Sequence, residues 1–414
     1  MIQNVLRHFA LLGGFTALAG CAAAHASEPQ PGSFGEDAAF LEQHTPIIEL
    51  TDDAGTARVL VAPGLEARVM TSTASGSNGP GYGWINKDLF ASGRLGPHIN
   101  AFGGEDRIWL GPEGGQFSIF FPPGAPFDLE HWQTPAPFDT EPFEVVSQDH
   151  GQVICRHEFT LTNYSKTQFK VRIDREVRLL SSAAAWKDLQ LDPANGVELV
   201  AYESINHLTN IGDQPWSKPK GLLSIWILGQ LNASPDAVVL VPCKQGPESE
   251  LGNIVESGYF GQVPPDRLAV KDGVIYFRAD AKYRSKIGVS PRRAKPALGS
   301  YDSSKHLLTL VQYTLNPADT DYVNSQWKIQ EHPFGGDVAN SYNDGPNALG
   351  KSLGNFYEVE SSSSAAELSP SQSAEHVHRT IHLTGDVTQL DRIAESVLGV
   401  HLADIPKNLP APQP

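Results

Sequence analysis

A strict alternation of apolar and charged side chains over residues 169–179 is the feature that most constrains the fold. A period of two over a stretch of this length predicts a long strand with one buried face. Arg175 breaks the pattern, because it places a charge on the apolar face. Residues 152–162 precede this strand across the turn Asn163-Tyr164-Ser165, so we expect the two segments to form a hairpin. The apolar face holds Phe169, Val171, Ile173, Val177 and Leu179, and the charged face holds Lys170, Arg172, Asp174, Glu176 and Arg178.

Short strand-like segments recur along the rest of the chain. The sequence holds 38 glycines and 31 prolines in 414 residues, which suits many strands joined by turns better than it suits long helices. Only two helices are expected, a short one over 34–43 that starts at the capping box Ser33–Glu36 and an amphipathic one over 387–398. The sequence therefore predicts an all-β protein, a large antiparallel sandwich, in one domain over 46–400. The further expected strands are 47–50, 58–61, 66–71, 117–121, 197–206, 222–228, 238–242, 274–279 and 306–314.

The first twenty residues are typical of an export signal. A short apolar run ends in Leu18-Ala19-Gly20-Cys21, which resembles a bacterial lipobox and predicts lipidation of Cys21. The alternative is cleavage after Ala24-His25-Ala26, which would release a soluble protein. With the lipobox, residues 1–20 are a lipoprotein signal peptide, 21–45 a tether with the short helix, and 401–414 a Pro-rich tail. The expected location is the cell envelope, with a lipid anchor in the outer membrane.

The net charge and the cysteine content exclude some classes of partner and cofactor. The formal net charge of −16 argues against nucleic acid and against an anionic membrane surface. Cys155 and Cys243 form either a disulfide or two separate buried thiols, and two cysteines alone cannot build a structural zinc site. No Gly-rich phosphate loop, H-E-x-x-H or G-x-S-x-G motif is present.

The stretch 354–383 combines carboxylates with imidazoles on two expected strands. In 356–360 the alternation puts Glu358 and Glu360 on one face together with Phe356. The following strand carries His376, His378 and His382, again on one face. Acids and imidazoles on neighbouring strands can form a general acid–base site, or they can form an ordinary polar sheet face.

The same stretch, read as FYEVESSS…L…H.HRT.HL, resembles the C-terminal part of the galactose-mutarotase-like superfamily. The chain as a whole is similar to an uncharacterised family of secreted bacterial proteins with that fold. The resemblance covers roughly residues 46–385 and implies a β-supersandwich that binds a sugar. The resembling stretches are 103–109 (GGEDRIW), 221–229 (GLLSIWILG), 283–288 (YRSKIG) and 340–346 (NSYNDGP).

The resemblance also implies an acid–base pair, but only the base has a matching residue in this sequence. Mutarotases use a Glu base and a His acid, and Glu358 matches the Glu position, with Glu360 as the runner-up. The mutarotase His lies in a Thr-Asn-His motif, whereas here Ile211 follows Thr209-Asn210. His207 lies four residues earlier, and His98 lies five residues before Gly103, where a second mutarotase His directly precedes a Gly-Gly pair. These departures point to a similar pocket with different acid–base groups, for which His378 and Asp344 are the candidate acids.

Three further clusters supply candidate binding residues. Glu105, Arg107 and Trp109 follow a Gly-Gly pair, where Arg107 could bind a carboxylate or vicinal hydroxyls, or could form an internal salt bridge. Arg284 and Lys286 are cations that suit an acidic sugar. Asn343 and Asp344 suit sugar hydroxyls, a calcium ion or a plain turn. Stacking on a pyranose ring is expected from Trp84, Trp109, Trp132, Trp216 and Trp327, whereas Trp226 is assigned to the core.

These observations predict an exported protein that binds a mono- or oligosaccharide on a concave sheet face. It would be an epimerase, lyase or hydrolase that uses acid–base chemistry, with Glu358 as the base. The alternative is a non-catalytic glycan-binding lipoprotein of the envelope. No cofactor is expected, apart from the calcium alternative.

Overall fold

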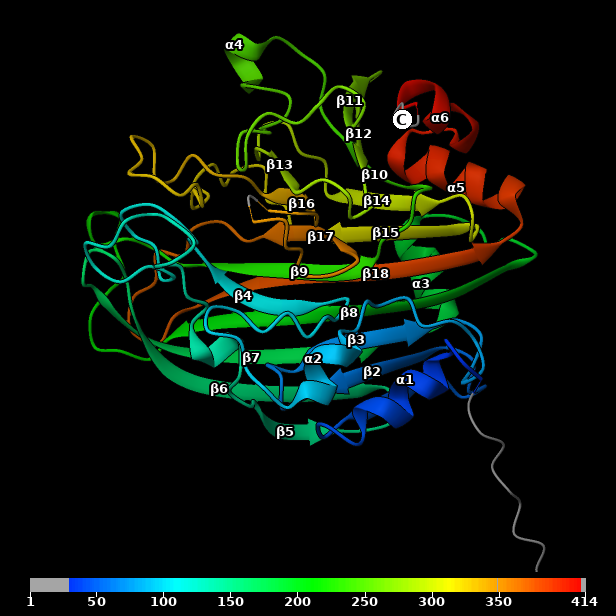
Figure 1. Ribbon diagram of the computed structural model, residues 1–414, viewed down its shortest axis with the longest axis horizontal. Helices are drawn as coiled ribbons and strands as arrows, with labels where there is room; N and C mark the ends of the chain where they lie inside the picture. Colours follow the sequence, from blue (N-terminus) through cyan, green and yellow to red (C-terminus); the bar gives the residue numbers. More distant parts are fainter. Residues whose placement is uncertain (1–29, 348, 411–414) are drawn as a thin grey trace, which may run out of the picture.

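Two antiparallel β-layers make up most of the molecule (Figure 1). The computed structural model describes residues 30–347 and 349–410. The expected signal peptide, the first part of the tether and the lipidation site Cys21 lie outside these residues and stay predictions. No helix in the described ranges has the length and apolar character needed to cross a membrane.

The first layer is a ten-stranded sheet with the order β11-β12-β10-β14-β15-β18-β8-β7-β6-β5. The alternating segment 169–179 lies in β7, which pairs with β6 along its whole length, from Leu161 opposite Phe169 to Gln152 opposite Arg178. The strand and hairpin predicted there are confirmed. The strands are β5 (Glu144–Gln148), β6 (Gln152–Thr162), β7 (Gln168–Leu179), β8 (Val197–Asn210), β10 (Ala237–Pro242), β11 (Leu268–Lys271), β12 (Val274–Arg278), β14 (Ala297–Asp302), β15 (Leu307–Tyr313) and β18 (Ser373–Gly385).

The second layer consists of a five-stranded sheet and a three-stranded sheet joined edge to edge. The five-stranded sheet has the order β13-β16-β17-β9-β4, and the three-stranded sheet is β1-β2-β3. Backbone hydrogen bonds from Val69 N to Asp106 O (2.9 Å) and from Asp106 N to Val69 O (3.3 Å) link the two. The strands are β1 (Ile48–Thr51), β2 (Arg58–Ala62), β3 (Arg68–Thr73), β4 (Arg107–Gly111), β9 (Ser224–Asn232), β13 (Ser285–Val289), β16 (Ala339–Asn343) and β17 (Phe356–Ser362).

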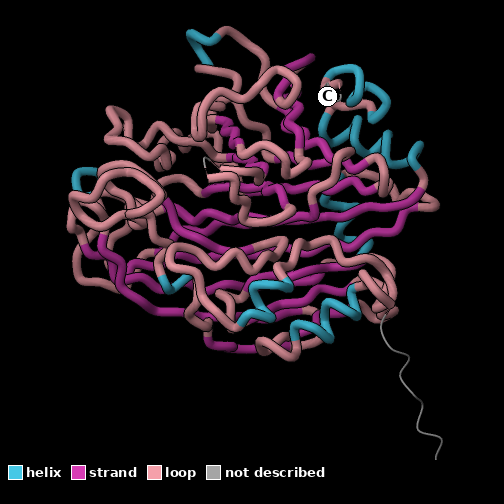
Figure 2. Tube along the Cα trace, in the orientation of Figure 1, coloured by secondary structure: helices cyan, strands magenta, loops and turns pink. Residues whose placement is uncertain are grey.

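The helices are short and lie outside the two layers (Figure 2). In α1, the Ser33 hydroxyl accepts from Glu36 N, as the capping box predicts. α3 and α5 cover the outer face of the ten-stranded sheet, where Trp186 and Ile393 join a core cluster with Leu240 and Ile381. The helices are α1 (Phe34–Leu41), α2 (Lys87–Ser92), α3 (Ser182–Leu189), α4 (Glu248–Leu251), α5 (Val387–Leu398) and α6 (Ile405–Asn408), with single 3-10 turns at Ala136–Phe138, Lys218–Lys220 and Leu402–Asp404.

Several local expectations differ from the structure. Residues 117–121 form bends rather than a strand. The stretch 340–345, expected as a turn, mostly belongs to β16. Residues 401–410 of the expected Pro-rich tail fold back, and Leu402, Ile405 and Leu409 are buried against the ten-stranded sheet. Cys155 and Cys243 are free thiols in separate core clusters, which decides between the two alternatives.

The remaining core fills the space between the layers. Val171 and Ile173 of β7 pack there with Ile108 and Ile227 of the second layer. At the other end, Phe277 packs with Val359 of β17. One face of the five-stranded sheet is therefore committed to the interior, and its opposite face is the surface on which a site can form.

Candidate functional site

A cavity of about 410 Å³ lies on that opposite face of the five-stranded sheet. Because side chains alternate along a strand, the residues of β4, β9, β13, β16 and β17 that line it come from one face of the sheet. Loops complete the wall at residues 97–99, Leu129, Trp132, Phe260, Trp327, Asp344, Gly345, Asn347 and residues 351–353. The lining strand residues are Arg107, Trp109, Trp226, Leu228, Gln230, Lys286, Tyr342, Phe356 and Glu358, together with Glu113 and Arg284 beside strand ends.

Glu358 is the central carboxylate of this wall. Its Oε1 accepts hydrogen bonds from Arg107 Nη2 and from Gln230 Nε2 (3.0 Å). The Arg107 guanidinium lies over the Trp109 ring, 4.5 Å from the ring centroid. Burial raises the pKa of Glu358 to about 7 even though the Arg107 charge opposes the rise. Both hydrogen bonds go to Oε1, so Oε2 is left for a ligand.

A second ion pair lies next to the first. Lys286 Nζ contacts Glu360 Oε2 at 3.0 Å, and Trp226 Nε1 donates to the same oxygen at 2.8 Å. The Lys286 ammonium lies 4.5 Å from the Trp226 ring centroid. Glu360 therefore lies on the same face of β17 as Glu358, as the alternation predicts. It does not line the cavity itself but holds Lys286 and Trp226 in the cavity wall.

Asp344 and Arg284 are connected through Tyr342. The Tyr342 hydroxyl donates to Asp344 Oδ1 (2.7 Å) and accepts from Arg284 Nε (3.2 Å). Gly354 N donates to the other Asp344 oxygen (2.8 Å). Burial raises the pKa of Asp344. Glu358, Arg107 and Asp344 thus line the same cavity, although both oxygens of Asp344 already bind protein groups.

Asn343 points away from this cavity. Its Oδ1 accepts from Ala281 N (2.8 Å), and its Nδ2 donates to Tyr283 O (2.9 Å). The oxygens that a calcium ion would need at Asn343 and Asp344 are therefore already hydrogen-bonded. In the part of the chain that the structure describes, no cluster of three or more His, Cys, Asp or Glu side chains is arranged to hold a metal ion.

Aromatic rings form most of the remaining wall. Trp109, Trp132, Trp226 and Trp327 all line the cavity. Trp132 stacks on Trp327 with ring centroids 5.9 Å apart, and Trp109 meets Trp226 edge-on at 5.6 Å. Trp226 belongs to a core cluster, as expected, and its ring also borders the cavity. Trp84 and Trp216 lie outside the lining set, Trp84 against Phe356 and Trp216 against Phe169.

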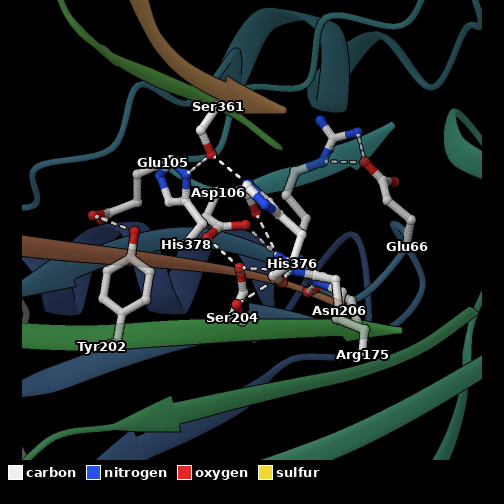
Figure 3. A network of polar contacts seen from close by, with 12 residues as sticks. Glu66, Glu105, Asp106, Arg175, Tyr202, Ser204, Asn206, Ser361, His376 and His378 are labelled. Atoms are coloured by element: carbon white, nitrogen blue, oxygen red, sulfur yellow. Dashed lines mark hydrogen bonds and ion pairs between the residues drawn. The ribbon is translucent and has the colours of Figure 1, made fainter. Parts of the chain in front are cut away.

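His378 lies on the other side of the sheet from Glu358. The strands β17 and β18 belong to different layers, which corrects the expectation that they are neighbours. The Ser361 hydroxyl faces the interior and contacts His376 Nε2 and His378 Nδ1, both at 2.8 Å (Figure 3). Burial lowers the pKa of His378 to about 4 and that of His376 to about 3. The structure does not bring His378 to Glu358.

Glu105 and His207 also lie away from the cavity. Glu105 Oε2 is buried between the layers, where it contacts His382 Nε2 (2.6 Å), Ser72 Oγ (2.9 Å) and Tyr202 OH (3.1 Å) (Figure 3 shows the last pair). His207 is half-exposed on β8, with Nε2 3.6 Å from Glu375. Neither residue is positioned to bind a ligand in the cavity.

Glu113 and Gln230 are cavity residues that the sequence did not reveal. Burial raises the pKa of Glu113, and Gln230 holds Glu358. Gln230 could have been found from the alternation of β9, since it follows Trp226 and Leu228 at a spacing of two. Glu113 follows the end of β4 in an irregular segment, and no periodicity marks it.

Comparison with known proteins places the chain in a protein family. Residues 32–409 match the model of a family of unknown function, DUF6786. The chain belongs to this family. The matched span contains both layers and every residue of the cavity wall. No curated protein matches the sequence.

Several solved structures are similar to this member of the DUF6786 family, and some of them are described as galactose mutarotase-like. The Slr1438 protein from Synechocystis sp. PCC 6803 is 13% identical, with 83% of this chain and 96% of that one covered and a TM-score of 0.49. A galactose mutarotase-like protein from Lactobacillus casei ATCC 334 is 11% identical (82% and 100% covered, TM-score 0.46). A galactose mutarotase related enzyme from Lactobacillus acidophilus is 9% identical (82% and 97%, TM-score 0.43). The sequence resemblance named proteins of the same kind as the last two.

Proposed function

We propose that the cavity binds a carbohydrate and that Glu358 is a general acid–base group acting on it. One observation carries the proposal: the Glu358 carboxyl, with a pKa raised to about 7, opens into a cavity walled by four tryptophans. A group whose pKa lies near the working pH can both take and give a proton, which is what a sugar isomerisation or bond cleavage requires.

The wall suits a sugar in two ways. Tryptophan rings offer flat apolar surfaces to the C–H faces of a pyranose. Charged and amide groups between them, Arg107, Gln230 and Glu358, can bind hydroxyls with a fixed geometry. The volume of about 410 Å³ falls within the range of about 300–1,000 Å³ that is usual for small-molecule sites.

Glu113 is the proposed partner carboxyl. It lines the same cavity, and burial raises its pKa, which favours the protonated form that an acid needs. Asp344 is less suited to this role, because Tyr342 OH and Gly354 N each bind one of its oxygens. In this proposal Glu358 takes a proton from a sugar hydroxyl while Glu113 gives one to the departing or ring oxygen.

A non-catalytic glycan-binding protein is the second candidate. It is favoured by the ion pair between Arg107 and Glu358, which stabilises the charged carboxylate and holds it in place. In that case the same wall recognises the sugar, and Glu358 acts only as a hydrogen-bond acceptor.

A proton-NMR time course with neutral and acidic mono- and oligosaccharides separates the two candidates. For an enzyme, the wild type accelerates anomer exchange or forms new products, and Glu358→Gln slows this by about 10²–10⁴-fold while sugar binding remains. Glu395→Gln, on the exposed side of α5, is the matched control and should turn over normally. Line broadening of one sugar without conversion would support the binding protein, and unchanged spectra across the panel would contradict both.

A further inference from the structure

Arg284 is held in a fixed position at the edge of the cavity. Its Nε donates to the Tyr342 hydroxyl at 3.2 Å, and its guanidinium lies over the Phe260 ring, 4.0 Å from the centroid. Tyr342 is itself fixed, because its hydroxyl donates to Asp344 at 2.7 Å. A guanidinium anchored through Nε and one face keeps the donors at its two terminal nitrogens for a ligand.

The charge of Arg284 is not matched by a carboxylate. The two other cations of the strand wall each have one, since Arg107 pairs with Glu358 and Lys286 pairs with Glu360. Within residues 30–347 and 349–410, no carboxylate lies within ion-pair distance of Arg284. In a chain with a net charge of −16, an anchored cation at a cavity with no carboxylate at ion-pair distance is a candidate to bind an anionic group.

Lys351 adds a second cation of the same kind. It lines the cavity from the loop between β16 and β17, and it also has no carboxylate at ion-pair distance in the described ranges. Asn347 N donates to Lys351 O (2.9 Å), and Lys351 N donates to Asn347 Oδ1 (3.1 Å), which closes the turn that carries the lysine. The loop is tied to the Arg284 anchor, because Gly354 N binds Asp344.

We propose that the saccharide bound by this cavity carries an anionic substituent, a carboxylate, sulfate or phosphate, and that Arg284 and Lys351 bind it. This inference rests on the proposed function. The planar fork of an arginine matches two oxygens of such a group, and a charge-assisted hydrogen bond is stronger than a bond to a neutral hydroxyl. The uncharged part of the sugar would then lie against the tryptophans and Glu358.

Calorimetric titration with matched sugars tests the substrate class. The pairs are galactose with galacturonic acid, and glucose with glucose 6-phosphate, with inorganic phosphate and sulfate alone as separate arms. We expect at least one anionic sugar to bind about 10- to 100-fold more tightly than its neutral match, with a preference that shrinks as salt rises. Arg284→Gln should remove most of this preference while leaving the affinity for the neutral sugar within about twofold.

Two further variants show whether a loss of binding is caused by misfolding. Lys351→Gln changes an exposed side chain, so it should lower the anionic preference without affecting the fold. Arg392→Gln, on the exposed side of α5, is the matched charge control and should leave both affinities unchanged.

Each other outcome overturns the inference, the proposed function or both. Equal binding of the neutral and anionic sugars would overturn this inference and leave the proposed function standing. Binding of inorganic phosphate as tight as that of glucose 6-phosphate would show an anion site without a sugar site and would also overturn it. If no sugar binds at all, the proposed function fails together with the inference.

Discussion

The two faces of β17 each carry a polar cluster, but only one of these clusters has access to the cavity. On the cavity face, Glu358 and Glu360 meet Arg107 and Lys286. On the interior face, Ser361 meets two histidines of the opposite layer. Both clusters are buried and both are built from groups that can titrate, yet only the first faces a space that a ligand can enter.

Burial shifts the pKa values in the two clusters in opposite directions. It raises the pKa of Glu358 to about 7 and lowers the pKa values of His376 and His378 to about 3 and 4. In each case burial disfavours the charged form. A shifted pKa alone therefore does not mark a functional group. Exposure to the cavity separates the candidate site from the interior network.

The interior network contains a buried ion pair that matches the one in the cavity wall. Arg175, the exception in the alternation of β7, contacts Asp106 Oδ1 at 2.5 Å, and its Nη1 donates to Asn206 Oδ1 at 2.6 Å (Figure 3). Asp106 Oδ2 also accepts from Ser204 Oγ at 2.8 Å. A charge on the apolar face of a strand is thus accommodated because a carboxylate from the facing layer reaches it.

The largest expected effect compares these two ion pairs. Arg175→Ala should lower the free energy of unfolding by about 3–5 kcal/mol, because it leaves the Asp106 carboxylate buried without its counter-charge. Arg107→Ala should cost less, because water in the cavity can solvate Glu358. Urea denaturation of both variants measures the difference, and equal losses would contradict the distinction between the two faces.

A smaller effect is the opposite pH dependence of the two clusters. The histidines have folded pKa values below the unfolded value of about 6.5, so their contribution is complete above pH 6.5. It is lost as the pH falls toward 4. Glu358 has a folded pKa above its unfolded value of about 4.5. Its contribution is therefore present at low pH and is lost as the pH rises from about 4.5 to 7.

Denaturation midpoints between pH 4 and 8 test this difference. Relative to wild type, Glu358→Gln should gain stability as the pH rises toward 7, whereas His378→Asn should show a shallower loss below pH 6.5. His207→Gln changes a half-exposed ring and should follow the wild-type curve. A Glu358→Gln curve parallel to wild type would mean that folding does not shift the pKa of Glu358, and its proposed proton transfer would lose its basis.

The smallest expected effect comes from Ser361. Its hydroxyl joins the two interior imidazoles, so Ser361→Ala leaves a nitrogen of each without that partner. The cost should be about 1–3 kcal/mol of unfolding free energy. Saccharide binding should not change, because the side chain faces away from the cavity. A loss of sugar affinity in a folded Ser361→Ala protein would show that the two faces are coupled.

Local periodicity made much of the fold predictable. The β6–β7 hairpin, the shared face of Glu358 and Glu360, and the helices α1 and α5 all follow from spacing and capping residues. Boundaries moved by a few residues, as with the strand expected from 66, which begins at Arg68. The short strand β16 was not predicted, because its polar residues are also those of turns.

The sequence by itself determined that the chain forms amphipathic strands and that two carboxylates share a face, because these depend on backbone geometry between near neighbours. Only the tertiary structure decided which layer each strand joins. It sent β17 and β18 to different sheets and so separated Glu358 from His378. It also brought Arg107 to Glu358 across 251 positions of sequence. Such partners are chosen by the packing of whole layers, for which no short stretch of sequence carries a signal.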